Sequence, residues 1–204
     1  MAELDTGFFV RWLTAAAAAV EREADTLTEL DSAIGDADHG VNMRRGFTAV
    51  TAALAEKPPA SPGAALGLAG RTLVSKVGGA SGPLYGTLLR RTGRELGDAA
   101  TVSREDLARA LGVGVEAVAA LGGAAEGDKT MLDALLPAVR ALPRSFAAAR
   151  QAASEGAVAT VPMRARRGRA SYLGDRSIGH EDPGAASSLL LVSALEQTAG
   201  RGDG

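Results

Sequence analysis

Apolar residues recur at spacings of three and four positions along most of this chain, which is the period of amphipathic α-helices. A predicted helix cap at Asp5 or Thr6 precedes the first such series. That series consists of Phe9, Trp12, Leu13, Ala16 and Val20. Nowhere do β-branched and aromatic residues alternate with polar ones over five or six positions, as they do in strands. The spacing therefore predicts an all-α fold.

Caps and prolines divide the chain into about eight predicted helices. Ser61 and Pro62 are typical of an N-cap and a first helical residue, Pro83 is expected to open the next helix, and Ser103 with Asp106 forms a capping signal. The residues expected on the inner faces of the second to fifth helices are Met43, Phe47, Val50, Leu54, Leu66, Ala69, Leu73, Val77, Leu84, Leu88, Leu107, Leu111, Val115, Val118 and Leu121. Further helices are expected over 131–142, 144–159 and 184–199. Short connections favour an antiparallel, up-and-down bundle or barrel, in which alternate loops share one end and form the ligand site.

The length of 204 residues suits a single domain over 1–204 that is large enough for a substantial core. Because only 3% of the residues are aromatic, that core is expected to consist of closely packed Ala, Leu and Val. A net charge of −2 offers no electrostatic argument for nucleic acid or an anionic membrane. The absence of cysteine excludes disulfides and thiolate metal sites. Without a basic N-terminal region or a long apolar run, the chain is expected to be cytoplasmic, with no membrane span.

The stretch LDSAIGDADHGVN (30–42) concentrates three aspartates around a glycine. Asp31, Asp36 and Asp38 lie five and two positions apart, and Gly35 is expected to permit a sharp turn between them. Such carboxylates suit Mg²⁺ or Ca²⁺ rather than zinc, and the pattern lacks the spacing of an EF-hand. Mg²⁺ commonly binds few carboxylates together with phosphates, which indicates a phosphorylated ligand. The alternative is that Asp36 or Asp38 caps the next helix, which would explain one aspartate of three.

Two further loops are rich in glycine. The run GGASG at 78–82 precedes a predicted helix, and N–H groups at such a position suit phosphate, although a flexible loop would show the same composition. The segment GGAAEGDKT at 122–130 resembles a Walker A loop but has Asp128 before Lys129 and follows a helix. A P-loop fold is therefore rejected, and a weaker role of this loop in nucleotide contact stays open.

Four arginines occupy the run RARRGR at 164–169. A solvated basic loop, or an arginine that reaches a phosphate, explains this run better than nucleic-acid binding, for which Tyr172 alone supplies too few aromatics. His39 and His180 are the only histidines, and each lies beside acids and glycine. Either could donate to phosphate, act as a base or contact a nucleotide, and the sequence does not choose between these roles.

The chain closely resembles the nucleotide-binding L subunit of dihydroxyacetone kinase in four motifs, which occur in the family's order. These are LDSAIGDADHGVNMRRGF, VGGASGPLYGT, EGDKTMLDALLP and RARRGRASYLGDRSIGHEDPGA. The resemblance extends from Trp12 to the last predicted helix. It implies an antiparallel eight-helix barrel that holds a magnesium-bound nucleotide in the loops at one end.

The resemblance also implies roles for individual residues. Asp31, Asp36 and Asp38 would ligate Mg²⁺. The residues implied to hold ADP or ATP are His39, Gly40, Val41 and Asn42 at the start of the second helix, Ala80 and Ser81 at the phosphates, Gly122 and Met131 at the adenine, and Arg169, Asp182, Pro183 and Gly184 as the closing wall.

The activity that the resemblance implies is transfer of the γ-phosphoryl group to dihydroxyacetone held on a separate K subunit. Bound ADP would be rephosphorylated in place by an M subunit of the phosphotransferase system, or ATP would exchange from solution. Two other classes stay open, a nucleotide-loaded module that regulates a transcription factor and a metal-dependent phosphatase. Because phosphoryl transfer relies mainly on positioning and charge neutralisation, no nucleophile from the protein is required.

Overall fold

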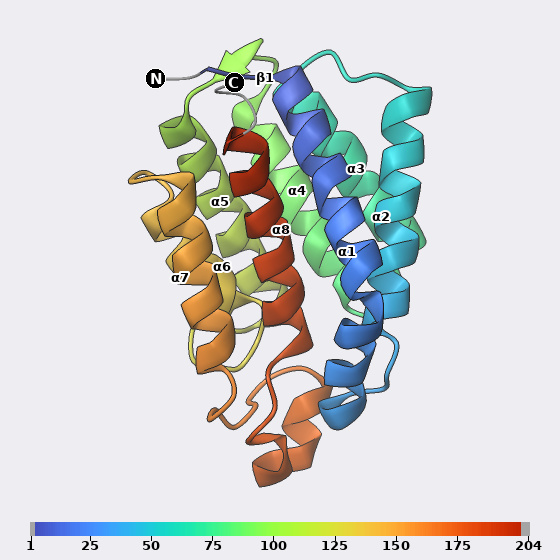
Figure 1. The fold of residues 1–204 in the computed structure, drawn as a ribbon, viewed down its shortest axis with the longest axis vertical. Coiled ribbons are helices and arrows are strands. Elements are labelled where there is room, and N and C mark those ends of the chain that lie inside the picture. The colour runs from blue at the N-terminus through green and yellow to red at the C-terminus, as the bar shows by residue number, and fades with distance from the viewer. Residues whose placement is uncertain (1–2, 201–204) are drawn as a thin grey trace.

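In the computed structural model, which describes residues 3–200, eight α-helices form an antiparallel barrel (Figure 1). The helices are α1 (Thr6–Ile34), α2 (His39–Glu56), α3 (Pro62–Lys76), α4 (Ser81–Leu96), α5 (Arg104–Gly122), α6 (Leu132–Ala141), α7 (Phe146–Ala159) and α8 (Pro183–Gly200). Each helix packs against the next along the chain, and α8 returns to contact α1, which closes the ring. The predicted all-α, up-and-down architecture is confirmed.

Three short elements lie at the two ends of the barrel (Figure 1). The strands β1 (Leu4–Asp5) and β2 (Thr101–Val102) pair antiparallel at one end. A 3₁₀ helix, η1 (Arg169–Ser177), lies at the other end, within the connection from α7 to α8. None of them was predicted, because elements this short leave no periodic pattern. Within residues 3–200 no helix is both long and apolar enough to cross a membrane, and residues 1–2 and 201–204 of the expected domain lie outside the described part.

The helix boundaries follow the predicted caps closely. The side chains of Asp5 and Ser61 accept hydrogen bonds at the starts of α1 and α3, and Ser103 belongs to a capping box at the start of α5. One boundary differs, because α4 begins at Ser81, ahead of the predicted start at Pro83. Proline fits this first turn because the N–H groups there have no partner within the helix.

The barrel closes through specific contacts as well as through apolar packing. Trp12 is only 1% exposed, and its indole Nε1 donates a hydrogen bond of 2.9 Å to the carbonyl of Leu191. This bond joins α1 to α8, the pair that completes the ring. On the opposite side α3 and α4 approach through glycines, since a Cβ at Gly63 would lie 2.5 Å from the carbonyl oxygen of Gly93. Close helix contacts thus compensate for the shortage of large core side chains.

One residue predicted to face inward does not, which provides a matched test of the core. Leu107 and Leu121 both lie on α5, but Leu107 is 0% exposed and Leu121 is 55% exposed, because the end of α5 extends beyond the packed interior. We expect Leu107→Ala to lower the free energy of unfolding by about 2–5 kcal/mol through loss of buried contacts and cavity formation. Leu121→Ala should change it by no more than about 0.5 kcal/mol. Urea denaturation followed by circular dichroism measures both, and equal losses would contradict the burial described.

Candidate functional site

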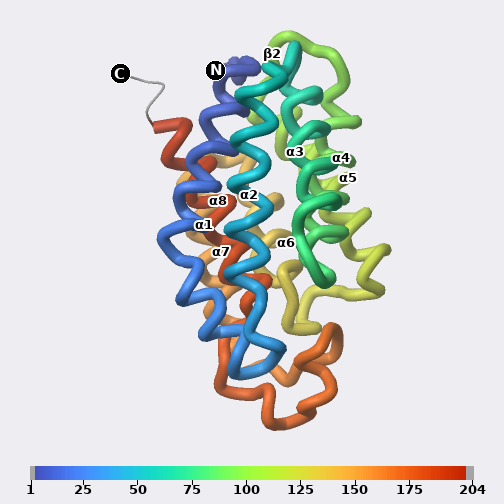
Figure 2. The backbone as a smooth tube through the Cα atoms, turned by 90° about the vertical axis from the view of Figure 1, so that its right-hand side faces the viewer, coloured from blue at the N-terminus to red at the C-terminus, as the bar shows by residue number. Residues whose placement is uncertain are grey.

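A cavity of about 190 Å³ lies at the barrel end where four alternate connections meet, at the bottom of Figure 2. Eleven of the fifteen predicted site residues line it, from the α1–α2, α3–α4, α5–α6 and α7–α8 connections. They are Asp31, Asp36, Asp38, His39, Ala80, Ser81, Met131, Arg169, Asp182, Pro183 and Gly184. The barrel therefore brings together segments that are widely separated in the sequence.

The other four predicted residues, Gly40, Val41, Asn42 and Gly122, are not among those that line this cavity. Gly40 has a packing role, because a Cβ there would lie 1.8 Å from a carbonyl oxygen of α1. Val41 is 47% exposed on the outer surface of α2, and Gly122 ends α5. The buried Asn42 accepts a hydrogen bond of 2.6 Å from Arg45.

The three aspartates of the α1–α2 turn form one cluster, with carboxylate oxygens within 4.8 Å of one another. Asp31 lies in the last turn of α1, where its Oδ2 accepts hydrogen bonds from the N–H groups of Asp38 (2.8 Å) and His39 (3.1 Å). A residue of α1 thus satisfies the start of α2, while the side chain of Asp38 makes no capping hydrogen bond. The Asp36 carboxylate pairs with Arg169 instead. The alternative that the side chain of Asp36 or Asp38 caps α2 is therefore wrong.

The sharp turn between these aspartates does not depend on Gly35 in the way predicted. Gly35 has φ −142°, whereas Ala37 has φ +60° and adopts the left-handed conformation. That conformation costs a residue with a side chain about 1–2 kcal/mol, which the surrounding contacts offset. Glycine is required at position 35 for another reason, because a Cβ there would lie 1.9 Å from Oδ1 of Asp31. The turn is therefore shaped around the carboxylate.

His39 is buried at the start of α2 and links three helices. Its Nδ1 lies 3.0 Å from Oγ of Ser81 on α4, and its Nε2 lies 2.8 Å from Oγ of Ser187 on α8. Burial lowers the pKa of His39 and outweighs the opposite effect of the Asp31 and Asp38 carboxylates. The imidazole is accordingly neutral, with one ring nitrogen as donor and the other as acceptor. This arrangement holds the Ser81 hydroxyl at the edge of the cavity.

Tyr85 continues this hydrogen-bond network into the barrel. Its hydroxyl lies 2.6 Å from Oγ of Ser187 and 2.8 Å from Oγ of Ser188. Burial raises the pKa of Tyr85 to about 12, so the phenol stays protonated. Tyr85, Ser187 and Ser188 were not predicted as site residues, because they occupy ordinary inner positions of α4 and α8. Hydroxyl groups at inward positions of otherwise apolar helices were the available signal.

Lys129 fastens the segment that covers the cavity. Its side chain is 1% exposed, and its ammonium lies within hydrogen-bond distance of four carbonyl oxygens. These belong to Thr160 (2.9 Å), Met163 (3.1 Å), Ser177 (2.7 Å) and His180 (2.5 Å). The lysine therefore joins both sides of the α7–α8 connection and has no donor position left for phosphate. The rejection of a P-loop agrees with this geometry, and the imidazole of His180 is exposed outside the cavity.

Two buried carboxylates order the neighbouring backbone. Asp133 accepts a hydrogen bond of 2.7 Å from the N–H of Thr130, which shapes the α5–α6 connection. Asp182 accepts one of 2.7 Å from the N–H of Ala185 at the start of α8, and its own N–H donates to Oγ1 of Thr160. Burial raises the pKa of Asp182 to about 7, with a further contribution from the charge of Asp133.

The arginines of the run RARRGR are balanced by acids rather than left free. Nη2 of Arg169 lies 3.1 Å from Oδ2 of Asp36, which connects the covering segment to the carboxylate cluster. Arg166 and Arg167 lie 4.0 Å and 3.8 Å from the carboxylate of Asp128. Only Arg169 of these three combines a place in the cavity wall with contact to the aspartate cluster.

We expect Lys129→Met to destabilise the covering segment, because four carbonyl groups, two of them in buried contacts, lose a charged donor. The free energy of unfolding should fall by at least about 3 kcal/mol, since each unsatisfied buried polar group costs about 1–3 kcal/mol. Hydrogen exchange should accelerate over 160–180. The exposed Lys57 provides a matched control, and Lys57→Met should alter neither quantity. Normal exchange in Lys129→Met would refute the anchoring role.

Asp182 predicts a specific dependence of stability on pH. Its pKa is about 7 in the folded protein and near 4 when unfolded, so the folded state holds the proton more tightly between these values. The contribution of Asp182 to the free energy of unfolding is therefore fully present near pH 4 and below, and it is lost as pH rises through 7. Asp182→Asn keeps a capping oxygen but does not titrate. Its free energy of unfolding, measured without metal or nucleotide, should increase relative to wild type between pH 5 and pH 8. A constant difference would contradict the assignment.

Comparison with known proteins identifies the family of this chain. The family model described as the DAK2 domain matches residues 33–197. The chain is 43% identical over 195 residues to the "PEP-dependent dihydroxyacetone kinase 1, ADP-binding subunit DhaL" of Listeria innocua, covering 95% of this chain and 97% of that protein. It is 42% identical to the "PEP-dependent dihydroxyacetone kinase, ADP-binding subunit DhaL" of Escherichia coli, covering 91% and 93%.

Solved structures share the fold. The crystal structure of the dihydroxyacetone kinase of C. freundii in its native form matches with a TM-score of 0.76 and 26% identity, over 94% of this chain. The same kinase in complex with AMP-PNP and Mg²⁺ matches with a TM-score of 0.73 and 28% identity, over 95% of this chain. This chain spans about a third of the length of those kinase chains. The barrel, the motifs in its cavity and these matches together show that the chain belongs to the DAK2 domain family.

Proposed function

We propose that this chain is the ADP-binding L subunit of a dihydroxyacetone kinase, a phosphotransferase that works with partner subunits. The observation that supports this most is the presence of three clustered carboxylates and a glycine-rich helix start in the walls of one cavity. Carboxylates bind a cation, and a cation together with backbone N–H groups binds phosphates. The two L-subunit relatives named above are described as ADP-binding.

In this proposal Asp31, Asp36 and Asp38 hold Mg²⁺. Their oxygens are hard ligands, and they lie close enough together to share a cation or a closely spaced pair of cations. The donor set therefore fits the metal. Asp31 is at present balanced by two N–H groups and Asp36 by Arg169, and Mg²⁺ would add charge that neutralises phosphate oxygens during transfer.

The other lining residues divide into polar and apolar walls. Ser81 and the N–H groups at the start of α4 provide donors for phosphate, with His39 holding the hydroxyl in place. Met131 offers an apolar wall for the adenine ring. Arg169 provides a guanidinium for phosphate when a cation balances Asp36. Gly184 and its neighbours at the start of α8 complete the wall.

The phosphoryl acceptor in this proposal is dihydroxyacetone on a separate K subunit, and an M subunit of the phosphotransferase system rephosphorylates ADP in place. Three relatives that the chain matches over more than nine tenths of their length are named PEP-dependent or PTS-dependent. A D-erythrulose kinase of Mycolicibacterium smegmatis also matches over 91% of this chain, which covers 34% of that protein. In this proposal, regions of the kinase outside this barrel select which small ketose is phosphorylated.

We expect Asp38→Asn to abolish binding of ADP with Mg²⁺ and leave the helical content unchanged, because one carboxylate charge leaves the metal site while the backbone contacts remain. Isothermal titration calorimetry on nucleotide-free protein measures this directly. Asp25→Asn, an exposed substitution on α1 of equal charge change, serves as the control and should bind normally. ADP and Mg²⁺ should also raise the melting temperature of the wild-type protein. At a ligand concentration of 100 times Kd, binding adds about 2.7 kcal/mol to the free energy of unfolding.

Reconstitution tests the transfer reaction itself. Wild-type protein supplied with a K subunit, dihydroxyacetone and a phosphohistidine-carrying M subunit should form dihydroxyacetone phosphate without free ATP. Asp38→Asn should not. Turnover driven by free ATP alone would overturn the proposed donor in favour of nucleotide exchange, and unchanged ADP affinity in Asp38→Asn would overturn the metal assignment.

A further inference from the structure

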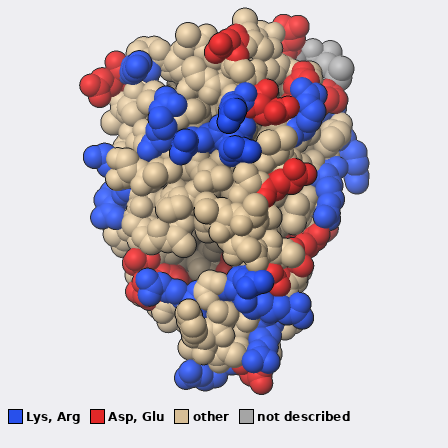
Figure 3. All heavy atoms as spheres, turned by 180° about the vertical axis from the view of Figure 1, so that it is seen from behind, with Lys and Arg blue, Asp and Glu red and all other residues tan. Residues whose placement is uncertain are grey.

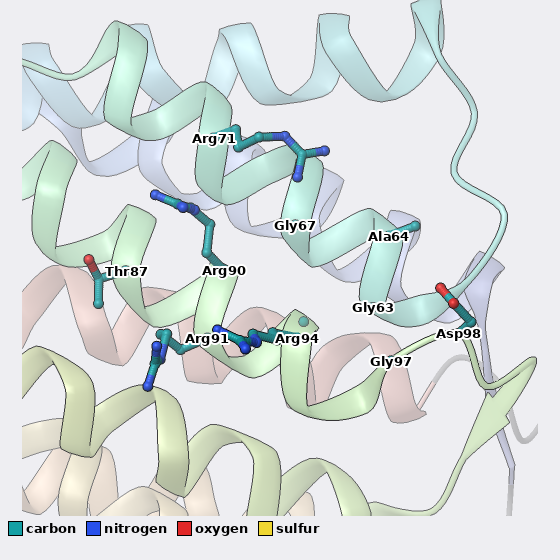
Figure 4. Close-up of a pocket in the computed structure, with 11 residues that line it drawn as sticks. Gly63, Ala64, Gly67, Arg71, Thr87, Arg90, Arg91, Arg94, Gly97 and Asp98 are labelled. Atoms are coloured by element: carbon teal, nitrogen blue, oxygen red, sulfur yellow. The ribbon is translucent and has the colours of Figure 1, made fainter.

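A second concave site lies on the outer surface of the barrel, between α3 and α4 (Figure 4). It is a groove of about 570 Å³, and it shares no lining residue with the cavity described above. Arg71 comes from α3, whereas Arg90, Arg91 and Arg94 come from α4. The groove extends to Asp98, in the connection that leads to β2, and thus toward the barrel end opposite the carboxylate cluster.

The positive charge of this groove is not balanced locally. Asp98 is the only acid among the lining residues, and within residues 3–200 none of the four arginines forms an ion pair. Arginines near the other cavity are paired, as shown by Arg169 with Asp36. Seen from behind, the upper half of the molecule carries a band of basic side chains (Figure 3). A concentration of unpaired cations in a chain of net charge −2 indicates an anionic ligand.

The floor of the groove contains a glycine that helix packing does not require. Gly63 and Gly93 have a packing role, because a Cβ at either would lie within 2.6 Å of backbone on the facing helix. A Cβ at Gly67 would meet only the tip of the Arg71 side chain, at 3.3 Å. Glycine inside a helix costs about 1 kcal/mol relative to alanine. Its effect at position 67 is to keep the floor open between the arginines.

We propose that this groove binds a small phosphorylated anion that carries at least two negative charges, such as a diphosphate. Guanidinium groups bind phosphate oxygens through paired hydrogen bonds. Figure 4 shows Arg90 reaching from α4 toward α3, whereas Arg71 lies along α3 with its guanidinium near Gly67. The volume falls in the range of about 300–1,000 Å³ that is usual for small-molecule sites. The lining contains no large apolar side chain, which a docked protein segment would need as an anchor.

Inorganic pyrophosphate is the probe, titrated calorimetrically into the whole protein at low salt with EDTA present. Wild type should show one saturable site. Arg71→Gln with Arg90→Gln should weaken binding at least tenfold, and Gly67→Leu should weaken it similarly by filling the floor without changing charge. The control combines Arg22→Gln with Arg144→Gln, two exposed arginines elsewhere that form no ion pair within the described residues. That control should keep its affinity within twofold.

The possible outcomes separate this site from its alternatives. Unchanged affinity in both groove variants would show that pyrophosphate binds elsewhere. An equal loss of affinity in the control variant would show general electrostatic attraction. Either result overturns the proposal, as does the absence of saturable binding to wild type. A second arm uses phosphatidylglycerol vesicles, which should not retain the protein. Vesicle binding that depends on Arg71 and Arg90, without pyrophosphate binding, would assign the groove to lipid headgroups. Thermal melting verifies that each variant is folded. If Gly67→Leu is unstable, the double variant Arg71→Gln with Arg90→Gln decides the outcome.

Discussion

The carboxylate of Asp31, in the last turn of α1, holds the site together. It accepts hydrogen bonds from the backbone N–H groups of Asp38 and His39 at the start of α2. This side chain thus links the end of α1 to the start of α2, and the two other aspartates lie beside it. The same contact sets His39 at the start of α2, where it reaches Ser81 and Ser187. One residue thus combines backbone capping of α2 with a place in the carboxylate cluster, beside the left-handed backbone of Ala37.

The opposite wall of the cavity depends on buried charge in a similar way. The ammonium of Lys129 gathers carbonyl groups from both sides of the α7–α8 connection, and Asp182 begins α8 beside it. A charged group is expensive to bury, and these contacts satisfy it fully. The covering segment then brings Arg169 to Asp36, so the two walls meet across the cavity. Buried polar contacts thus fix the arrangement of the loops around the cavity.

The two concave regions of the barrel present side chains of opposite charge. The end cavity presents carboxylates, so the function proposed above requires a cation there before phosphates can bind. The flank groove presents guanidinium groups directly. Close packing of α3 against α4 depends on Gly63 and Gly93, and both glycines also line the flank groove. The same small residues that compensate for a core poor in aromatics thus also shape the outer surface.

Much of this protein followed from local sequence. Caps at Asp5, Ser61 and Ser103 predicted helix starts correctly, and the helical period predicted the buried faces except at Leu121. The three aspartates around a glycine indicated a cation site, and the folded turn brings their carboxylate oxygens within 4.8 Å of one another. The order of four motifs indicated the family, which the comparisons confirmed.

Tertiary structure alone decided which groups meet. Sequence spacing did not show that Asp31 would cap the next helix, that Gly40 would pack against α1, or that Lys129 would bind carbonyls rather than phosphate. The physical reason is that helix period and capping depend on residues within a few positions of one another. Contacts between loops depend on the closure of the ring between α1 and α8, which places distant segments at one end. The sequence by itself thus determined the helices and the types of ligand atom, whereas barrel closure determined their partners.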